Sequence, residues 1–451
     1  MKTSIPGPNN RLGARNVLRF ASDALGLLRQ MTDRYGDMVE MKILGTRWII
    51  VNNPRDIEEA MVKRAAIMGR DEYVEILEHA LGKGLLTSDG ELWRRQRKLM
   101  AQAFTPKRIR EYAATMSEVT DAGITWTDGE VINIHDEMSR VTMEVVARVL
   151  FGTGVARDDV ELVRDSMEAT AAYYANSPEA LAKLPTWIPT PRNLQLRRAV
   201  KRIDALLYRI ISDRRSGRER PPEGERLDLL GTLLAACDDE GVGMSDQQLR
   251  DEAITLFLAG HETTALALAH TLTLISTHPE VERRLVAELN EVLGGRRPEA
   301  ADYKKLTYTE QVLKEGMRLY PPAWTTGRAV LEEMELGGYR IPAGAQLIFC
   351  QWVVHRDRRF YPDPEAFNPD RWTPEATRDL PRYAYFPFGG GPRVCIGNHF
   401  AMMEAVLILA VIMQRVHLEL LPGQRLELVP SVTLRAKQGL RMRVATRPAA
   451  D

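Results

Sequence analysis

Apolar residues recur every three to four positions over most of the chain, a period that predicts a largely helical protein. The predicted helices cover residues 22–36, 54–64, 91–104, 107–125, 137–151, 158–176, 193–215, 226–238, 246–277, 279–293, 307–320 and 398–415. Residues 38–51, 328–354 and 417–446 alternate instead like short β-strands. The pattern therefore indicates a mainly α protein with small β-sheets (α+β). No repeat and no long polar linker interrupts it, so we expect one domain over residues 1–451.

The first twenty residues are largely polar and are broken by Pro6-Gly7-Pro8, which predicts an extended segment over residues 1–20. They contain no apolar run of the length found in signal peptides or membrane-spanning helices. We therefore expect no membrane anchor and a cytoplasmic location.

The composition is that of an ordinary globular protein, with 44% hydrophobic and 27% charged residues. Lysine plus arginine and aspartate plus glutamate both number 61, so the chain lacks the basic excess typical of nucleic-acid binding. The three cysteines, Cys237, Cys350 and Cys395, are too few and too scattered for a disulfide framework or a zinc knuckle. This cysteine usage fits a reducing compartment.

One cysteine, Cys395, lies among glycines just before a predicted helix, two residues after Arg393. Thiolates are stabilised at helix N-termini and beside cations, so the position suits a reactive or metal-ligating sulfur. Gly391 and Gly397 give the backbone the freedom to approach a flat ligand closely or to take a positive φ.

The long helix predicted at 246–277 has an unusual centre. Ser245 and Gln248 form a capping box at its start, and Pro279 follows its end. Gly260 costs about 1 kcal/mol relative to alanine inside a helix, so helix propensity does not explain it. A threonine hydroxyl bonded back to the preceding turn could open a local groove here. A zinc-protease motif is excluded because position 265, four residues after His261, is alanine.

Residues 388–397 resemble the haem-ligand loop of the cytochrome P450 family, Phe-x-x-Gly-x-Arg-x-Cys-x-Gly, at every specified position. The resemblance implies a single P450 fold that holds haem b between the long central helix and the cysteine-bearing helix. It implies that Cys395 is the thiolate ligand of the iron. The other cofactor-binding positions of the loop would be Phe388, Arg393 and Gly397.

Residues 259–264 resemble the family pattern Ala-Gly-x-Asp/Glu-Thr-Thr. The resemblance implies that Glu262 and Thr263 deliver protons during dioxygen activation. It thus implies a monooxygenase that hydroxylates or epoxidises a hydrophobic small molecule such as a fatty acid, terpenoid or steroid. A haem-thiolate peroxygenase or isomerase that uses peroxide remains the alternative, although Glu262 and Thr263 favour dioxygen. A non-catalytic haem sensor or carrier would need no such proton relay.

Glu315 and Arg318 lie three residues apart on a predicted helix. Several other pairs share this spacing and are expected to be solvated: Glu91/Arg94, Glu161/Arg164, Glu280/Arg283 and Glu375/Arg378. In the P450 family such a pair, followed by a segment like residues 367–372, forms a buried ion network with a further arginine, here Arg371. We expect this network to lock the cysteine loop.

Haem propionates require cations or donors at the cofactor edge. By resemblance, Trp93 and Arg97 on a helix would bind them, together with Arg393 and Arg328. The substrate pocket implied by the resemblance is mostly apolar and includes Leu256, Phe257, Ala259, Ala323, Trp324, Thr325 and Val432.

A cluster of cations follows Trp93 along the chain: Arg94, Arg95, Lys98, Lys107, Arg108 and Arg110. It predicts either a solvated face or a docking surface for an acidic ferredoxin or flavodoxin. The sequence shows no flavin or nicotinamide module, since Gly389-Gly390-Gly391 lacks the dinucleotide pattern. We therefore expect electrons to come from NAD(P)H through separate redox proteins, and we expect the enzyme to be a monomer.

Overall fold

The computed structural model describes residues 4–8, 13–43, 45–152, 157–176, 185–217 and 228–447. The chain divides into two compact units. Unit 1 consists of residues Met1–Tyr73, Gln311–Asn398 and Leu428–Arg435. Unit 2 consists of residues Val74–Glu310, His399–Glu427 and Ala436–Asp451. Our expectation of one domain over residues 1–451 stays a prediction.

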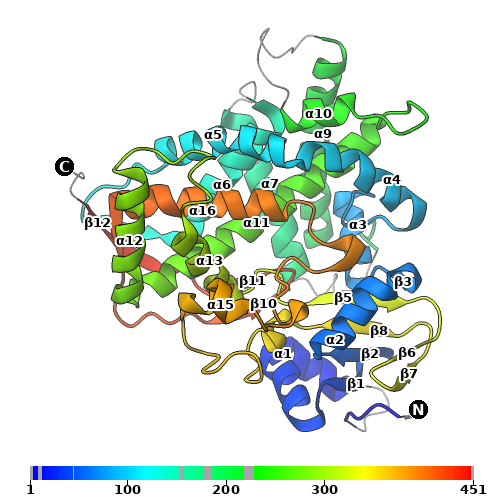
Figure 1. The fold of residues 1–451 in the computed structure, drawn as a ribbon. Coiled ribbons are helices and arrows are strands. Elements are labelled where there is room, and N and C mark those ends of the chain that lie inside the picture. Colours follow the sequence, from blue (N-terminus) through cyan, green and yellow to red (C-terminus); the bar gives the residue numbers. More distant parts are fainter. Residues whose placement is uncertain are drawn as a thin grey trace. The chain divides into compact units, whose positions relative to one another are not determined.

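Unit 1 is built on a five-stranded sheet in the order β1-β2-β8-β5-β3 (Figure 1). Its strands are β1 (Met38–Ile43), β2 (Thr46–Val51), β3 (Met68–Gly69), β5 (Thr326–Val330) and β8 (Gln346–Phe349). β2 and β8 are parallel, whereas β1 with β2, β5 with β8, and β3 with β5 are antiparallel.

Alternate residues of β2 face opposite sides of this sheet, as the period of a strand requires. Trp48 and Ile50 pack in one apolar cluster with helix α1 (Ala14–Tyr35). Ile49 and Val51 pack in another with the turn that follows α2 (Pro54–Glu58). The remaining elements of unit 1 include β6 (Met334–Leu336), β7 (Tyr339–Ile341), α14 (Gln351–Val354), α15 (Pro374–Thr377) and β10 (Leu428–Pro430).

The predicted extended segment over residues 1–20 is wrong from Ala14 onward, because α1 begins there. The helix is interrupted at Asp23, whose backbone is non-helical with φ −157°. The Asp23 carboxylate accepts the Gly26 N–H at 2.9 Å and so restarts the helix close to the predicted start at 22. The first half is fixed by a distant contact, the bond from the buried Asn16 side chain to the carbonyl of Lys42.

Unit 2 is mostly helical, and its long helix α11 (Asp246–Ser276) packs along α6 (Ile134–Phe151) (Figure 1). The predicted capping box of α11 is confirmed, since the Ser245 hydroxyl accepts the Gln248 N–H and the Gln248 side chain accepts the Ser245 N–H. The other helices are α3 (Glu72–Leu81), α4 (Gly90–Ala101), α5 (Pro106–Gly123), α7 (Arg157–Asn176), α9 (Pro191–Arg215), α10 (Leu229–Ala235), α12 (Pro279–Leu293) and α16 (Asn398–Arg415).

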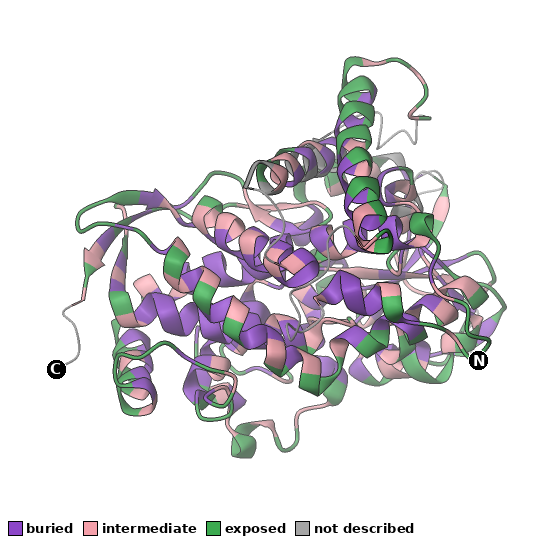
Figure 2. Cartoon of the chain, turned by 90° about the horizontal axis from the view of Figure 1, so that it is seen from above, coloured by how far each residue is buried: buried purple, intermediate pink, exposed green. Residues whose placement is uncertain are grey.

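A small antiparallel sheet in the order β4-β12-β9 completes unit 2. Its strands are β4 (Val131–Asn133), β9 (Val416–Leu420) and β12 (Arg441–Thr446). Four elements cross a boundary between the units in sequence: α3, α13 (Thr307–Leu319), α16 and β11 (Leu434–Ala436). In Figure 2 buried and exposed residues alternate along many helices, as expected for amphipathic helices. The predicted class, mainly helical with small sheets, is therefore confirmed. Among the described helices, none is both long and apolar enough to cross a membrane.

Candidate active site

The cysteine loop, residues 388–397, is seated on the turn Glu59–Lys63 of unit 1. Gly391 has φ 64°, and a Cβ at this position would lie only 1.9 Å from the carbonyl oxygen of Met61. Both the left-handed backbone and the close approach therefore require glycine at position 391. Gly397, by contrast, does not have a positive φ. The positive φ allowed for in the sequence analysis is thus present at Gly391, and a close approach of Gly397 to a flat ligand stays a prediction.

Two hydrogen bonds fix the backbone at Cys395 and at Gly391, four residues before it. The Tyr383 hydroxyl accepts the Gly391 N–H at 3.1 Å, and the Phe388 carbonyl accepts the Cys395 N–H at 2.9 Å. Cys395 itself is exposed, and Phe388 and Arg393 beside it are half-buried. The loop thus presents a sulfur on a fixed backbone where a ligand can reach it.

The predicted ion network is present in unit 1, and its residues come before the cysteine loop in the sequence. Glu315 and Arg318 are fully buried and form two bonds of 2.8 Å, from Arg318 Nε to Oε2 and from a terminal nitrogen to Oε1. Arg371 Nε lies 3.3 Å from Glu315 Oε1. The same carboxylate also accepts the Asn368 N–H at 2.9 Å and the Trp372 indole N–H at 3.0 Å. The structure therefore brings the three predicted residues together and adds two donors that sequence reasoning missed.

The remaining donors of Arg318 bind backbone carbonyls. They reach the oxygens of His355 at 2.9 Å, Pro364 at 2.7 Å and Ala366 at 3.0 Å. A buried charge is tolerated only when its partners satisfy it completely, and this guanidinium meets that condition. The network thus ties α13 to the segment that leads to the cysteine loop.

His355 extends this network and was missed in the sequence. Its carbonyl accepts from Arg318, while its ring nitrogen Nε2 accepts the Phe386 N–H at 3.0 Å. The ring centroid lies 5.1 Å from that of Tyr385. Burial, reinforced by the charges of Arg318 and Arg356, lowers the pKa of His355 well below its ordinary value, so the imidazole is neutral. A neutral ring can accept a hydrogen bond, and His355 therefore links Arg318 to the residues that precede the cysteine loop.

The centre of α11 lies in unit 2 and differs from the rest of that helix in exposure. Ala259 is exposed and Thr263 is half-buried, whereas most neighbouring residues are buried. Thr263 donates its hydroxyl proton to the Ala259 carbonyl at 2.6 Å, and Thr264 lies 3.0 Å from the Gly260 carbonyl oxygen. The predicted back-bonding is therefore present, and α11 stays helical across it. Glu262, next to Thr263, is 7% exposed.

Gly260 has a packing reason. A Cβ at this position would lie 3.2 Å from a methyl group of Val146, so glycine lets α11 approach α6 closely. From the same helix α6, the Thr142 hydroxyl oxygen lies 2.9 Å from the His261 carbonyl oxygen and 2.8 Å from the Met138 carbonyl oxygen, so the two carbonyls share its one proton. Helix α6 therefore fixes one side of the turn that carries Glu262 and Thr263.

The four residues predicted to bind propionates lie in different parts of the chain. Trp93 and Arg97 are half-buried on the same face of α4, four residues apart. Arg328 is half-buried on β5, where one of its terminal nitrogens donates to the Gly327 carbonyl at 2.6 Å. Arg393 is half-buried in the cysteine loop. Their role at a cofactor stays a prediction.

The predicted pocket residues differ in burial. Phe257 is 1% exposed and packs its ring 5.2 Å from that of Phe151, and Trp324 is 3% exposed and donates to the Ser431 carbonyl. The others are accessible: Leu256, Ala323 and Thr325 are half-buried, and Ala259 and Val432 are exposed. The pocket itself stays a prediction.

Sequence reasoning also missed two buried carboxylates at the start of α11. Asp251 accepts the Lys83 N–H at 2.8 Å, and Glu252 accepts the Leu85 N–H at 2.9 Å. Glu252 is fully buried, and burial raises its pKa to about 8. These contacts hold residues 82–88, the segment before α4, against α11. From the sequence alone, a carboxylate pair at the start of an amphipathic helix is predicted to be exposed to solvent. The tertiary fold buries it.

The cationic cluster around α4 is largely neutralised by acidic side chains of unit 2. Arg95 pairs with Asp238 at 2.7 Å, Lys98 with Asp239 at 2.5 Å and Arg108 with Glu111 at 3.1 Å. Arg94 pairs with Glu91. Lys107 and Arg110 are exposed. The structure thus favours the solvated face over the docking surface for most of this cluster.

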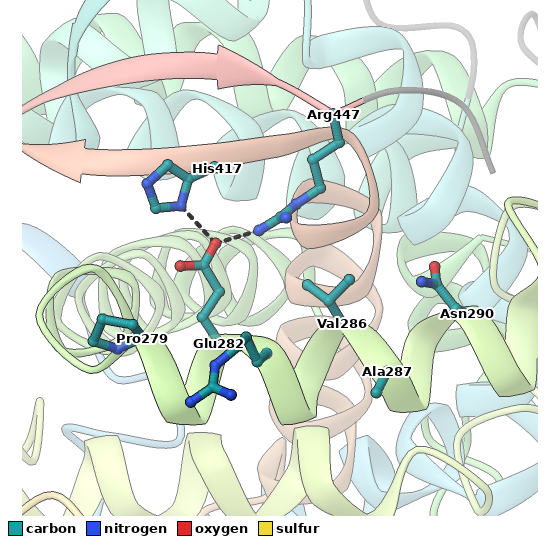
Figure 3. Close-up of a pocket in the computed structure, with 8 residues that line it drawn as sticks. Pro279, Glu282, Val286, Ala287, Asn290, His417 and Arg447 are labelled. Atoms are coloured by element: carbon teal, nitrogen blue, oxygen red, sulfur yellow. Dashed lines mark hydrogen bonds and ion pairs between the residues drawn. The ribbon is translucent and has the colours of Figure 1, made fainter.

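A surface pocket of about 370 Å³ lies along α12, away in sequence from all predicted site residues (Figure 3). Glu282 points from α12 toward β9 and the end of β12, where it accepts from His417 at 2.7 Å and from Arg447. These bonds join α12 to the small sheet. We interpret this pocket as structural.

Comparison with known proteins identifies the family. The family model described as Cytochrome P450 matches residues 5–440. The chain belongs to the cytochrome P450 family. Cyclooctatin synthase of Streptomyces melanosporofaciens is 38% identical over 430 residues, which cover 94% of this chain and 92% of that protein. Pentalenene oxygenase of Streptomyces avermitilis is 31% identical over 417 residues, covering 92% and 91%.

Solved P450 structures agree. A retinoic acid-bound cyanobacterial CYP120A1 superposes with a TM-score of 0.86 at 28% identity, covering 99% of this chain and all of the other. The haem domain of a cytochrome P450DA gives a TM-score of 0.85 at 26% identity, covering 99% and 98%. This chain is therefore a haem-dependent P450 monooxygenase, an oxidoreductase that incorporates an oxygen atom from dioxygen.

The cysteine loop fits the thiolate side of a haem, because it offers an exposed thiol on a fixed backbone. The roles of Arg97, Arg328 and Arg393 at the propionates stay predictions.

Proposed function

We propose that this P450 monooxygenase oxidises a terpenoid, and that Cys395 supplies the thiolate ligand of its haem. In the overall reaction, one oxygen atom of dioxygen enters a C–H or C=C bond of the substrate. The other leaves as water after uptake of two electrons and two protons. The names of the two Streptomyces relatives support a terpenoid, and exposed Ala259 and half-buried Leu256 on α11 suit an apolar ligand. The observation that carries the proposal is the exposed Cys395 thiol on its clamped loop.

Each proposed cofactor residue has one task. The bound haem supplies the redox chemistry, and its thiolate ligand favours cleavage of the O–O bond. Arg97, Arg393, Arg328 and Trp93 would bind the propionates, and Phe388 and Gly397 would shape the loop around the sulfur. The Glu315–Arg318–Arg371 network keeps that loop in place, because its donors bind the backbone leading to it.

Glu262 and Thr263 handle protons on the oxygen side. Thr263 already donates to the Ala259 carbonyl, so its oxygen can accept a proton from one side and pass its own on when that bond breaks. Glu262 is next to Thr263 in sequence and is almost fully buried. We assign it the role of passing protons to Thr263.

We propose further that electrons from NAD(P)H arrive through a separate ferredoxin or flavodoxin. Lys107 and Arg110, the exposed cations at the start of α5, are the best candidates to meet an acidic partner. Because rim charges act mainly on the association rate, reversing both charges should raise the KM for the reductant and weaken its dependence on salt.

The proposal is tested first on the ligand and then on the reaction. The reduced holoenzyme should show the red-shifted carbon-monoxide band of thiolate-ligated haem, and Cys395→Ser should lose it. A panel of terpenoids, fatty acids and steroids is then screened for a spin-state shift of the haem. We expect terpenoids to give the largest shifts and to be converted only with NAD(P)H and redox proteins. A fatty acid or steroid that shifts while terpenoids do not would overturn the substrate class.

The same assay distinguishes the proposed dioxygen-dependent monooxygenase from a peroxide-dependent enzyme. We expect Thr263→Ala to consume NAD(P)H at a similar rate but to release more hydrogen peroxide and less product. Turnover with peroxide alone, equally fast in the wild type and in Thr263→Ala, would instead favour the peroxygenase.

A further inference from the structure

Glu404 is a carboxyl group buried in the middle of the apolar helix α16, with an exposed fraction of 0%. It follows Cys395 by nine residues and is not among the site residues that we predicted from the sequence. Its Oε2 atom lies 3.1 Å from the Thr264 hydroxyl oxygen of α11. Its Oε1 atom is buried and has no hydrogen-bond partner among the described residues.

An ionised carboxylate in this environment would be costly. Unpaired buried charges cost several kcal/mol, and among the described residues Thr264, which is uncharged, is the side chain that contacts the Glu404 carboxyl group. Burial accordingly raises the pKa of Glu404 to about 8. The carboxyl group is therefore protonated at neutral pH.

The hydrogen-bond count agrees with this protonation state. A threonine hydroxyl carries one hydrogen, yet Thr264 Oγ1 lies within reach of both the Gly260 carbonyl oxygen, at 3.0 Å, and Glu404 Oε2. The Gly260 carbonyl and an ionised Glu404 carboxylate would both only accept, so an ionised Glu404 would compete with Gly260 for the single Thr264 proton. A protonated Glu404 removes this competition, because Thr264 can then donate to Gly260 and accept from Glu404.

We propose that Glu404 is a positioning residue that acts as a neutral acid, donating to Thr264 and so holding the turn of α11 that carries Glu262 and Thr263. This role rests on the proposed function of those two residues. Figure 1 shows α6, α11 and α16, the three helices of unit 2 that are involved. Helix α6 holds one side of the turn through Thr142 and Val146, and Glu404 of α16 holds it through Thr264.

The position of the turn matters because proton delivery depends on geometry. A displacement of about 1 Å at a reacting group can cost about a hundredfold in rate. Loss of the Glu404–Thr264 bond would let the 260–264 turn relax, so that Glu262 and Thr263 would deliver protons less effectively and a larger share of the electrons would end in hydrogen peroxide.

The test compares variants in the haem-loaded full chain. Glu404→Gln keeps the shape and an N–H donor toward Thr264, whereas Glu404→Met keeps the volume but cannot donate. Thr264→Val removes the acceptor and is nearly isosteric, which keeps the proposal testable should Glu404→Met fail to fold. The matched control is Thr271→Val, because Thr271 is also buried on α11 and bonds back to Ala267 at 2.7 Å.

Infrared spectroscopy reads the protonation state directly. The wild type should show the carbonyl stretch of a buried protonated carboxyl group at neutral pH. Glu404→Gln should lose this band, and Thr264→Val should shift it to higher frequency because the donated hydrogen bond is gone. A wild type without a band that Glu404→Gln removes would overturn the proposal, and this result is independent of any turnover.

The positioning role is tested by the coupling efficiency, measured as product formed per NAD(P)H consumed. We expect Glu404→Met and Thr264→Val each to lower product formed per NAD(P)H by roughly threefold or more, with no further loss in the double variant. Glu404→Gln and Thr271→Val should stay within about twofold of the wild type. Full coupling in Glu404→Met, or equal losses in Glu404→Gln and Glu404→Met, would overturn the role. Failure of the proposed function would instead appear as absent turnover in the wild type.

Discussion

Glu252 leads to a quantitative prediction about how stability depends on pH. The side chain is fully buried at the start of α11, where one oxygen accepts the Leu85 N–H and the other has no partner among the described residues. Burial raises its pKa from 4.5 to about 8, and the nearby charge of Asp251 adds to this rise. The bond from Leu85 acts in the opposite direction but does not outweigh burial.

The sign follows from the protons that each state binds. Below pH 4.5 the carboxyl group is protonated in both states, and its contribution to stability is fully present. Between pH 4.5 and about 8 the unfolded chain has released this proton while the folded protein keeps it. The free energy of unfolding therefore falls as the pH rises, by about 1.4 kcal/mol per pH unit for this group. From pH 5 to 7.5 the loss amounts to roughly 3 kcal/mol.

Glu252→Gln tests this magnitude, because the amide oxygen can still accept from Leu85 and the side chain no longer titrates. Urea unfolding of haem-loaded wild type and variant, followed by circular dichroism from pH 5 to 7.5, isolates the contribution as a difference. We expect the wild type to lose about 3 kcal/mol relative to Glu252→Gln across this range.

The control is Glu291→Gln, which removes the same charge from an exposed position on α12. Its free energy of unfolding should run parallel to that of the wild type at every pH. Parallel curves for Glu252→Gln as well, or a wild type that gains stability relative to it with rising pH, would show that Glu252 is ionised in the folded protein. The burial argument would then be wrong.

Other substitutions probe the cysteine loop and its support. Arg318→Ala should leave Glu315 buried without its partner, lower the free energy of unfolding by about 3–5 kcal/mol and abolish haem incorporation. The control Arg94→Ala breaks an exposed pair of the same spacing and should lower the free energy of unfolding by under about 1 kcal/mol. A haem-loaded Arg318→Ala of normal stability would contradict the network's role. Gly391→Ala should lose the carbon-monoxide band because its Cβ meets the Met61 carbonyl, while Gly389→Ala, with a similar φ of 70° but open space around it, should keep the band; equal effects would mean that backbone strain alone matters. His355→Phe keeps the ring but cannot accept the Phe386 N–H, so it should cost about 1–3 kcal/mol, with partial recovery in His355→Gln; an unchanged urea midpoint would show that this bond is dispensable.

Much of the fold could be predicted from the sequence because its signals are local. The Ser245–Gln248 capping box, the helix end before Pro279 and the strands within residues 38–51 depend on residues a few positions apart, and the structure has all of them. The start of α1 could not be predicted in this way. The polar residues after Ala14 are helical because Asn16 bonds the carbonyl of Lys42, a partner far along the chain.

The candidate site shows the same division. The residues at the cysteine loop and at the centre of α11 stand out in the sequence, because chemistry at these positions demands glycine, cysteine, carboxylate and hydroxyl groups in a fixed order. The sequence did not show that the carboxylates of Glu252 and Glu404 are buried, or that His355 joins Arg318 to the segment before the loop. Nor did it show that acidic residues neutralise most of the cations around α4.

The sequence by itself determined the helical pattern, the family and the residues that mark a haem-thiolate site, because these are written in short motifs and in the period of apolar residues. Only the tertiary structure decided which charged groups are buried and lose their hydration. Among several Glu/Arg pairs of identical spacing, Glu315 and Arg318 are fully buried, while Glu91 and Arg94 are exposed. The physical reason is that burial depends on contacts between segments far apart in the chain, such as α13 with residues 355–372, and no local pattern encodes them.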